Sequence, residues 1–135
     1  MTVVVLSASP NASGLTAACA RAAVEGASGE GADAREIRLN GAGIGLCRAC
    51  GDGWGTCRGE HRCQVEDGFQ DVHCRVTEAD ALVLVTPVYW GEMSESAKAL
   101  PTGSVAARAA PELRAGSRAS PSSPWPPRAD RAGGW

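Results

Sequence analysis

Apolar residues gather into short runs along the first hundred residues, and their spacing changes from one run to the next. Residues 2–8 and 81–86 are nearly continuous aliphatic runs, which is typical of strands buried on both faces of a parallel sheet. Residues 33–39 alternate between polar and apolar positions. They therefore predict an outer strand with Ile37 and Leu39 pointing inward.

The first predicted helix is unusually rich in alanine. Residues 15–27 favour helix for this reason, and Gly29 and Gly31 end the segment. A helical stripe of small and apolar side chains is expected to face the core; it comprises Leu15, Ala18, Cys19, Ala22 and Ala23.

A second helix is predicted after residue 67, because Asp67 has the side chain of a helix cap. The apolar residues that follow keep helical spacing; they are Phe69, Val72, Val76 and Ala79. Residues 95–100 begin a third helix.

Strands and helices thus alternate three times, which predicts an α/β fold with a doubly wound parallel sheet. Ligands in this architecture bind beyond the carboxyl ends of the strands. Two loops occupy that position here. We call residues 7–16 the first loop and residues 87–94 the second loop.

Residues 101–135 differ in composition from the predicted domain of residues 1–100. They hold six of the eight prolines, and alanine, proline, glycine and serine fill 23 of their 35 positions. Because such a segment has little apolar surface to bury, we expect a disordered C-terminal tail. One hypothesis explains this tail as the out-of-frame ending of a longer gene.

Charge and composition exclude several classes of protein. A net charge of −2 provides no excess of positive charge for nucleic acid or anionic lipid. No apolar run is long enough to span a membrane, and the first residues lack the pattern of a signal peptide. We therefore expect a cytoplasmic protein whose six cysteines serve metal, redox or core roles rather than disulfides.

The first loop is crowded with hydroxyl and amide side chains. Together with the amides at the start of the following helix, they predict an anion site for a phosphate. The candidate binding residues are Ser7, Ser9, Pro10, Asn11, Ser13, Gly14 and Thr16. The sequence has neither a dinucleotide fingerprint nor a P-loop. The alternative is an ordinary turn in which Ser13 is the N-cap of the helix.

The second loop places two aromatic side chains side by side. Tyr89 and Trp90, followed by Gly91, come directly after a predicted strand, which suits contact with a flat conjugated ring. The candidate ring-contacting residues are Pro87, Val88, Tyr89, Trp90 and Gly91. The alternative is a hydrophobic plug that covers the end of the sheet.

Taken together, the two loops resemble the flavodoxin-like superfamily, and most closely its NADPH-dependent FMN reductases and iron-sulfur flavoproteins. The family motif S-x-S-P-x-x-x-S/G-x-T is matched in the first loop, and S/T-P-V-Y-W-G is matched by residues 86–91. The resemblance covers about residues 2–100. It implies that the first loop holds the FMN phosphate and that the second loop flanks the isoalloxazine ring.

The resemblance also implies an architecture and partners. The family has a five-stranded sheet in the order 2-1-3-4-5, and this chain shows only three of those strands, so a truncated flavodoxin-like sheet in the order 2-1-3 is expected. The third strand would then have an unpaired apolar edge. Members of the family use NAD(P)H as reductant, pass electrons to a small acceptor and often form homodimers.

Four cysteines form a separate candidate site between residues 47 and 63, the cysteine segment. Cys47, Cys50, Cys57 and Cys63 have the spacing C-x2-C-x6-C-x5-C, and thiolates suit zinc or a [4Fe-4S] cluster. The middle gap differs from the C-x2-C-x2-C run of the iron-sulfur flavoproteins. A cysteine-rich loop without metal, redox-active through its first two cysteines, remains an alternative. Cys19 and Cys74 are expected in the core.

Our first functional hypothesis is an FMN-dependent oxidoreductase that passes electrons from NAD(P)H to a small acceptor. The protein would bind and orient the flavin, and no side chain is assigned as a catalytic acid or base. One alternative is a four-cysteine metal module for electron transfer or structure. Another is an inactive truncated product.

Overall fold

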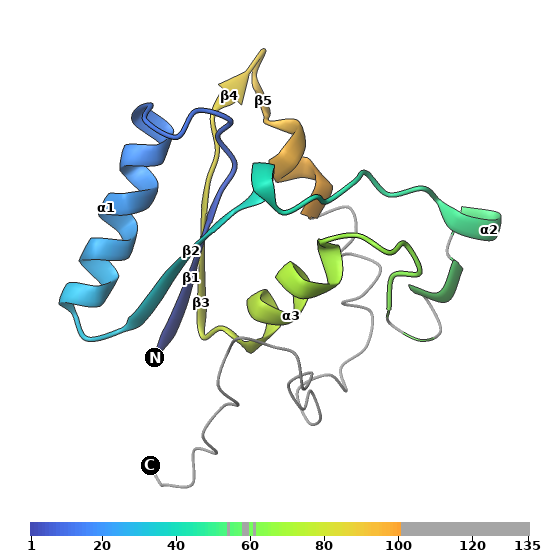
Figure 1. Cartoon of the computed structure of the whole chain (residues 1–135), viewed down its shortest axis with the longest axis horizontal. Helices are drawn as coiled ribbons and strands as arrows, with labels where there is room; N and C mark the ends of the chain where they lie inside the picture. The colour runs from blue at the N-terminus through green and yellow to red at the C-terminus, as the bar shows by residue number, and fades with distance from the viewer. Residues whose placement is uncertain (54, 58–59, 61, 101–135) are drawn as a thin grey trace, which may run out of the picture.

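Three parallel strands form the sheet of the protein, in the order β2-β1-β3 (Figure 1). The computed structural model describes residues 1–53, 55–57, 60 and 62–100. Its parallel strands are β1 (Thr2–Ser7), β2 (Asp33–Arg38) and β3 (Ala81–Val85). The α/β prediction and the strand order 2-1-3 are therefore confirmed. The expected tail, residues 101–135, lies outside the described residues.

β1 is the centre of this sheet, and its side chains are buried on both faces. Val4 and Val5 have no exposed surface, as expected for a β-branched run between two covered faces. Ser7, the last residue of β1, lies opposite Arg38 of β2 and Val85 of β3. The ends of all three strands thus meet at one edge of the sheet.

Helix α1 (Leu15–Gly29) covers one face of the sheet, but with a different stripe from the predicted one. Ala17 and Ala20 are buried, and Val24 packs against the same cluster as Val3 and Val5. Leu15 and Cys19 of the predicted stripe are exposed. The prediction of this face was wrong because a helix made mostly of alanine shows little contrast between its faces.

Helix α3 (Phe69–Glu78) and the helical residues 95–100 cover the opposite face. Phe69 and Val72 are buried against Val4 and Leu6 of β1, so the predicted helical spacing is confirmed. Asp67 precedes the N-cap residue Gly68, and its Oδ1 accepts the N–H of Phe69 at 2.8 Å. The acidic side chain thus stabilises the start of this helix.

β3 is more exposed than predicted. Leu82 is 44% exposed and Leu84 is 39% exposed, although the sequence predicts a strand buried on both faces. Among the described residues β3 pairs only with β1, and its outer edge has no strand beside it. The prediction of full burial was wrong, whereas the expectation of an unpaired apolar edge holds for the described part of the chain.

Short elements complete the described structure. The 3-10 helix η1 (Leu39–Gly41) follows β2, and the cysteine segment contains α2 (Cys50–Gly53) and η2 (Gly55–Cys57). The strands β4 (Val88–Tyr89) and β5 (Glu92–Met93) form a small antiparallel hairpin in the second loop. None of the helices in the described ranges combines the length and the hydropathy needed to span a bilayer.

Candidate functional site

The first loop leads from the carboxyl end of β1 to the start of α1. The N-cap residue of α1 is Gly14, in an extended conformation, and no side chain caps the helix. The first amides of a helix have no acceptor within it. Within the described residues no other protein acceptor is found for the N–H groups of Leu15, Thr16 and Ala17. The first turn also lacks acidic residues, so this helix end is open to an anion.

Hydrogen bonds inside the first loop hold its shape. The Ser9 hydroxyl donates to the Asn11 carbonyl oxygen at 3.1 Å and accepts the Asn11 N–H at 3.2 Å. Asn11 Oδ1 accepts both the N–H of Ser13, at 3.0 Å, and its hydroxyl, at 3.1 Å. The alternative in which Ser13 caps α1 is therefore wrong. Its hydroxyl is bound within the loop, and the helix end stays uncapped.

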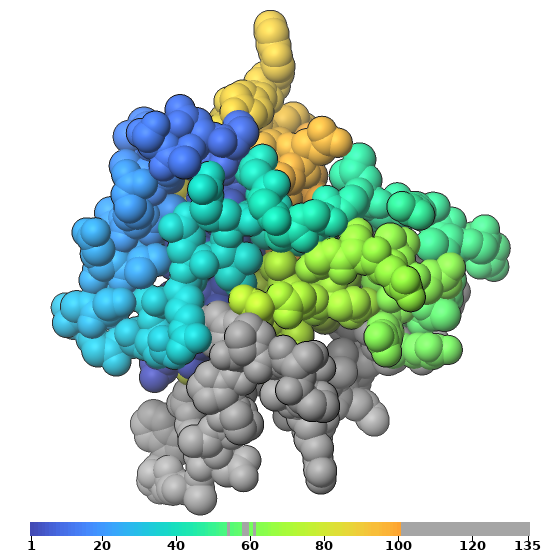
Figure 2. Space-filling view, viewed as in Figure 1, coloured from blue at the N-terminus to red at the C-terminus, as the bar shows by residue number. Residues whose placement is uncertain are grey.

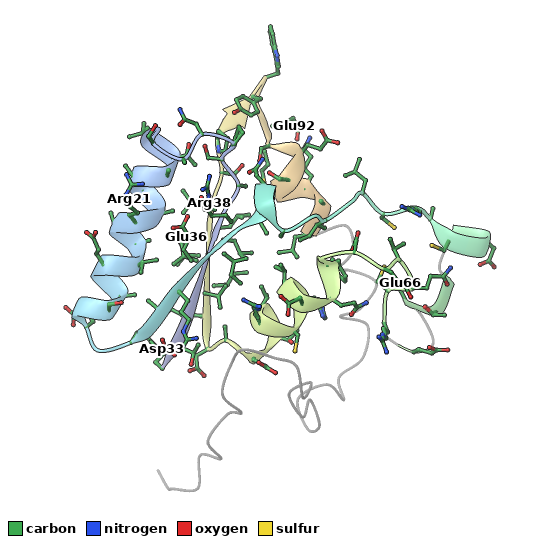
Figure 3. The ribbon with its side chains drawn as sticks, in the orientation of Figure 1. Arg21, Asp33, Glu36, Arg38, Glu66 and Glu92 are labelled. Carbon is green, nitrogen blue, oxygen red and sulfur yellow. The ribbon has the colours of Figure 1, made fainter. Side chains whose placement is uncertain are left out.

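Two further polar side chains flank this helix end from the sheet. Ser7 is only 1% exposed, and it shares the α1-covered face of β1 with Val3 and Val5. No hydrogen bond to its hydroxyl is found within the described part of the chain. Arg38 lies opposite Ser7 in the register, and Figure 3 shows it on the side of β2 that faces α1.

Sequence reasoning did not single out Arg38. The signal was nevertheless present, because Arg38 is the last residue of the strand that follows the first helix. In a parallel sheet that position lies beside the carboxyl end of the central strand. An exposed guanidinium there adds a positive charge beside the first loop.

The second loop begins at the same edge of the sheet. The Ala8 N–H donates to the Val85 carbonyl oxygen at 2.9 Å, so the two loops start side by side. The β4–β5 hairpin turns through Trp90 and Gly91, which both have positive φ, 53° and 80°. Two such residues between paired strands are the signature of a type I′ turn, in which tryptophan is a strained choice.

The hairpin exposes a cluster of apolar side chains. Trp90 is 103% exposed and Tyr89 is 51% exposed, while Val88 and Met93 are exposed beside them. Figure 2 shows the hairpin projecting beyond the rest of the molecule. The alternative of a plug that covers the sheet end is therefore wrong. These aromatic rings lie open to solvent at the edge where the helix end of α1 also lies.

The structure thus groups the predicted flavin-site residues at one edge of the sheet. The first loop contributes Ser7, Ser9, Pro10, Asn11, Ser13, Gly14 and Thr16, and the second loop contributes Pro87, Val88, Tyr89, Trp90 and Gly91. Figure 1 shows both loops at the end of the sheet where β1 and β3 finish.

The four cysteines of the cysteine segment lie elsewhere, around one pocket beside α3. Cys47, Cys50, Cys57 and Cys63 all line this pocket, and Phe69 of α3 lines it too. Within the described residues, however, no three cysteine, histidine or acidic side chains converge closely enough to hold one metal ion. The four thiols thus line one pocket, and a metal bound by them stays a prediction.

The two remaining cysteines behave differently from each other. Cys19 is exposed on α1, so its expected place in the core was wrong. Cys74 is partly buried in α3 and donates its S–H to Glu78 Oε1 at 3.3 Å. Burial, followed by this hydrogen bond, raises the pKa of the Cys74 thiol to about 11. At neutral pH this thiol is protonated and a poor nucleophile.

Comparison with known proteins agrees with this geometry. Residues 1–100 match the family model of NADPH-dependent FMN reductases. An iron-sulfur flavoprotein of Methanocaldococcus jannaschii is 30% identical over 100 residues, which cover 74% of this chain and 50% of that protein. An iron-sulfur flavoprotein of Methanosarcina thermophila is 28% identical over 79 residues, which cover 58% of this chain and 39% of that protein.

The chain spans half or less of the length of these two relatives. No solved structure matches it significantly. The residues matched by the family model, 1–100, include both loops and the cysteine segment.

Proposed function

Because the chain belongs to the NADPH-dependent FMN reductase family, we propose that it is an FMN-dependent oxidoreductase. It takes electrons from NAD(P)H and passes them to a small acceptor. Bound FMN supplies the chemistry, since a flavin accepts a hydride and releases electrons singly or in pairs. The residues of this chain bind the flavin and orient it.

The observation that supports this proposal is the open amino end of α1. Three amides at this end have no protein acceptor in the described structure, and the helix dipole makes the end positive. The buried Ser7 hydroxyl adds a donor, and Arg38 adds a charge nearby. A phosphate dianion suits such a set of donors, because it has several strong acceptor oxygens.

The second loop supplies the other end of the site. The exposed rings of Tyr89 and Trp90 offer flat apolar surface at the same edge of the sheet, which suits an isoalloxazine ring. Contact with a flavin would also cover part of an apolar cluster that otherwise faces water. The phosphate therefore anchors the cofactor, and the hairpin contacts its ring.

Flavin titration tests this function. We expect the fluorescence of FMN to be quenched when the 135-residue chain is added. FMN should bind roughly a hundredfold more tightly than riboflavin, because charge-assisted bonds to the phosphate contribute about 3 kcal/mol in total. Reduction of bound FMN by NADH or NADPH, followed by absorbance, then tests the reductant. Equal affinity for FMN and riboflavin, or no binding of either, contradicts the proposal.

The cysteine pocket supports a second candidate function, electron transfer through an iron-sulfur cluster. All four cysteines line one pocket, yet no three of them in the described structure meet around a single ion. Zinc requires its sulfurs at about 2.3 Å from one point, whereas a cluster is larger and binds thiolates that lie farther apart. Cys47, Cys50, Cys57 and Cys63 would hold such a cluster, and both relatives are named iron-sulfur flavoproteins.

Anaerobic reconstitution with iron and sulfide tests this second candidate. A broad visible absorbance that disappears in C50S supports it, and C19S is the matched control because Cys19 lies on α1, away from the pocket. Stoichiometric zinc binding without any visible absorbance contradicts the cluster.

A further inference from the structure

We propose that Ser94 is a positioning residue that holds the first loop and the second loop at a fixed spacing. The inference rests on the proposed function, because it concerns how one FMN is held at both of its ends. Ser94 follows β5 at the end of the second loop and is only 4% exposed. It lies outside both sets of predicted flavin-contacting residues.

The hydroxyl of Ser94 joins three segments of the chain. Its Oγ donates to the Ala8 carbonyl oxygen at 3.0 Å and lies 3.1 Å from the hydroxyl of Thr86. It also accepts the N–H of Ala97 at 3.4 Å. A serine hydroxyl has one proton and two lone pairs, so it can bond to one acceptor and two donors at a time.

This link fastens the base of the second loop to the first loop. The Ser94 N–H donates to Thr86 Oγ1 at 3.2 Å, so the residues on either side of the hairpin are tied together. Ala8 belongs to the first loop, and 86 residues separate it from Ser94 in the sequence. The Ser94 hydroxyl is thus the point at which both loops are bonded to one buried atom.

Ser96 is a neighbouring serine that serves as a control for Ser94. Its hydroxyl lies 3.3 Å from Ser94 Oγ and 3.2 Å from Asn40 Oδ1, and it reaches the Ala8 carbonyl at the longer distance of 3.4 Å. Within the described structure, the Ser96 hydroxyl touches the second loop only at Ser94 Oγ. Removal of its hydroxyl therefore leaves the Ser94 link between the loops in place.

Fixed spacing matters because FMN bridges two separate subsites. The phosphate end belongs to the first loop and the ring end to the second, so the two contacts reinforce each other only when their separation matches the ligand. When the link is loosened, the ring of a phosphate-bound FMN has a lower effective concentration at the second loop. It leaves the affinity of each subsite for a fragment of the ligand unchanged.

The test compares FMN with two fragments, riboflavin and inorganic phosphate, on the full 135-residue chain. Fluorescence titration gives the flavin affinities, and competition with FMN gives that of phosphate. We expect Ser94→Ala to weaken the binding of FMN about tenfold, because one buried hydrogen-bond link is lost. The affinities for riboflavin and for phosphate should change less than twofold. Ser94→Thr, which keeps the oxygen, should restore most of the FMN affinity, and Ser96→Ala should change it less than threefold.

Each outcome separates the inference from the proposed function. If Ser94→Ala weakens the binding of FMN, riboflavin and phosphate by the same factor, or leaves all three affinities unchanged, the positioning role is overturned while FMN binding stands. A wild-type chain that binds no FMN overturns the proposed function and this inference with it. Should Ser94→Ala fail to fold in a thermal unfolding assay, Ser94→Cys replaces the hydroxyl by a weaker S–H donor with little change in shape and gives the same test.

Discussion

The first loop and the second loop meet at one edge of the sheet, but the chain organises them to very different degrees. In the first loop, Ser9 is 5% exposed and its hydroxyl makes two hydrogen bonds to Asn11. At the tip of the second loop, Trp90 is 103% exposed and adopts a strained positive φ. One loop is held by its own side chains, and the other presents its side chains to solvent.

This difference teaches how the two ends of a flavin would be bound. The anion end is organised before any ligand arrives, because its donors have few competing acceptors and its loop is internally bonded. The ring end gains most of its burial from the ligand itself. Changes in the first loop should therefore alter discrimination between FMN and riboflavin, and changes in the second should alter the affinity for both.

The largest effect is expected from a carboxylate at the open end of α1. Leu15 is 82% exposed, so Leu15→Asp leaves the core intact and stabilises the helix by about 0.3–1 kcal/mol through its dipole. The same charge repels the phosphate by about 2 kcal/mol, so FMN should bind roughly thirtyfold more weakly, with riboflavin unchanged. Fluorescence titration and thermal unfolding measure the two opposite effects.

The neutral variant Leu15→Asn controls for the loss of the leucine side chain. It should bind FMN like the wild type. If the Asp and Asn variants bind FMN equally well, the phosphate does not lie at this helix end.

A smaller loss is expected when the first loop is loosened. Asn11→Ala removes the Oδ1 acceptor of two hydrogen bonds from Ser13, each contributing about 1 kcal/mol. FMN should then bind about tenfold more weakly, and riboflavin less than twofold. Ser28→Ala, at the opposite end of α1, is the control and should change neither affinity. An equal loss of affinity for both flavins would show that this loop does not bind the phosphate.

The smallest effect is expected at the tip of the hairpin. Trp90→Ala should change the free energy of unfolding by less than about 0.5 kcal/mol, because the ring has no buried surface to lose. FMN and riboflavin should both bind about fivefold more weakly, for loss of about 1 kcal/mol of aromatic contact. Trp90→Phe should recover most of this affinity. Unchanged binding of both flavins in Trp90→Ala would remove this residue from the site.

Much of the fold could be predicted because its signals are local. Two aliphatic runs predicted β1 and β3, and the alternation of residues 33–39 predicted β2. The spacing of Phe69 and Val72 predicted the buried face of α3. The buried face of α1 could not be predicted, since alanine occupies both of its sides. The exposure of Leu82 and Leu84 depends on which strand lies beside β3, and the residues of β3 carry no information about that.

The site shows the same division between local and distant information. The first loop was predicted from its own serines and asparagine, whose hydrogen bonds span only two residues. Arg38 and Ser94 were missed because their roles depend on contacts with β1 and Ala8, far away in the sequence. Only the strand order brings these residues to the same edge.

The central claim is that the first amides of α1 hold the phosphate of the flavin. Amide chemical shifts of the 15N-labelled chain, recorded during titration with FMN, test it most directly. We predict the largest shift changes at Leu15, Thr16 and Ala17, and smaller changes at the same amides with inorganic phosphate. FMN binding that leaves these three amides unchanged would contradict the account.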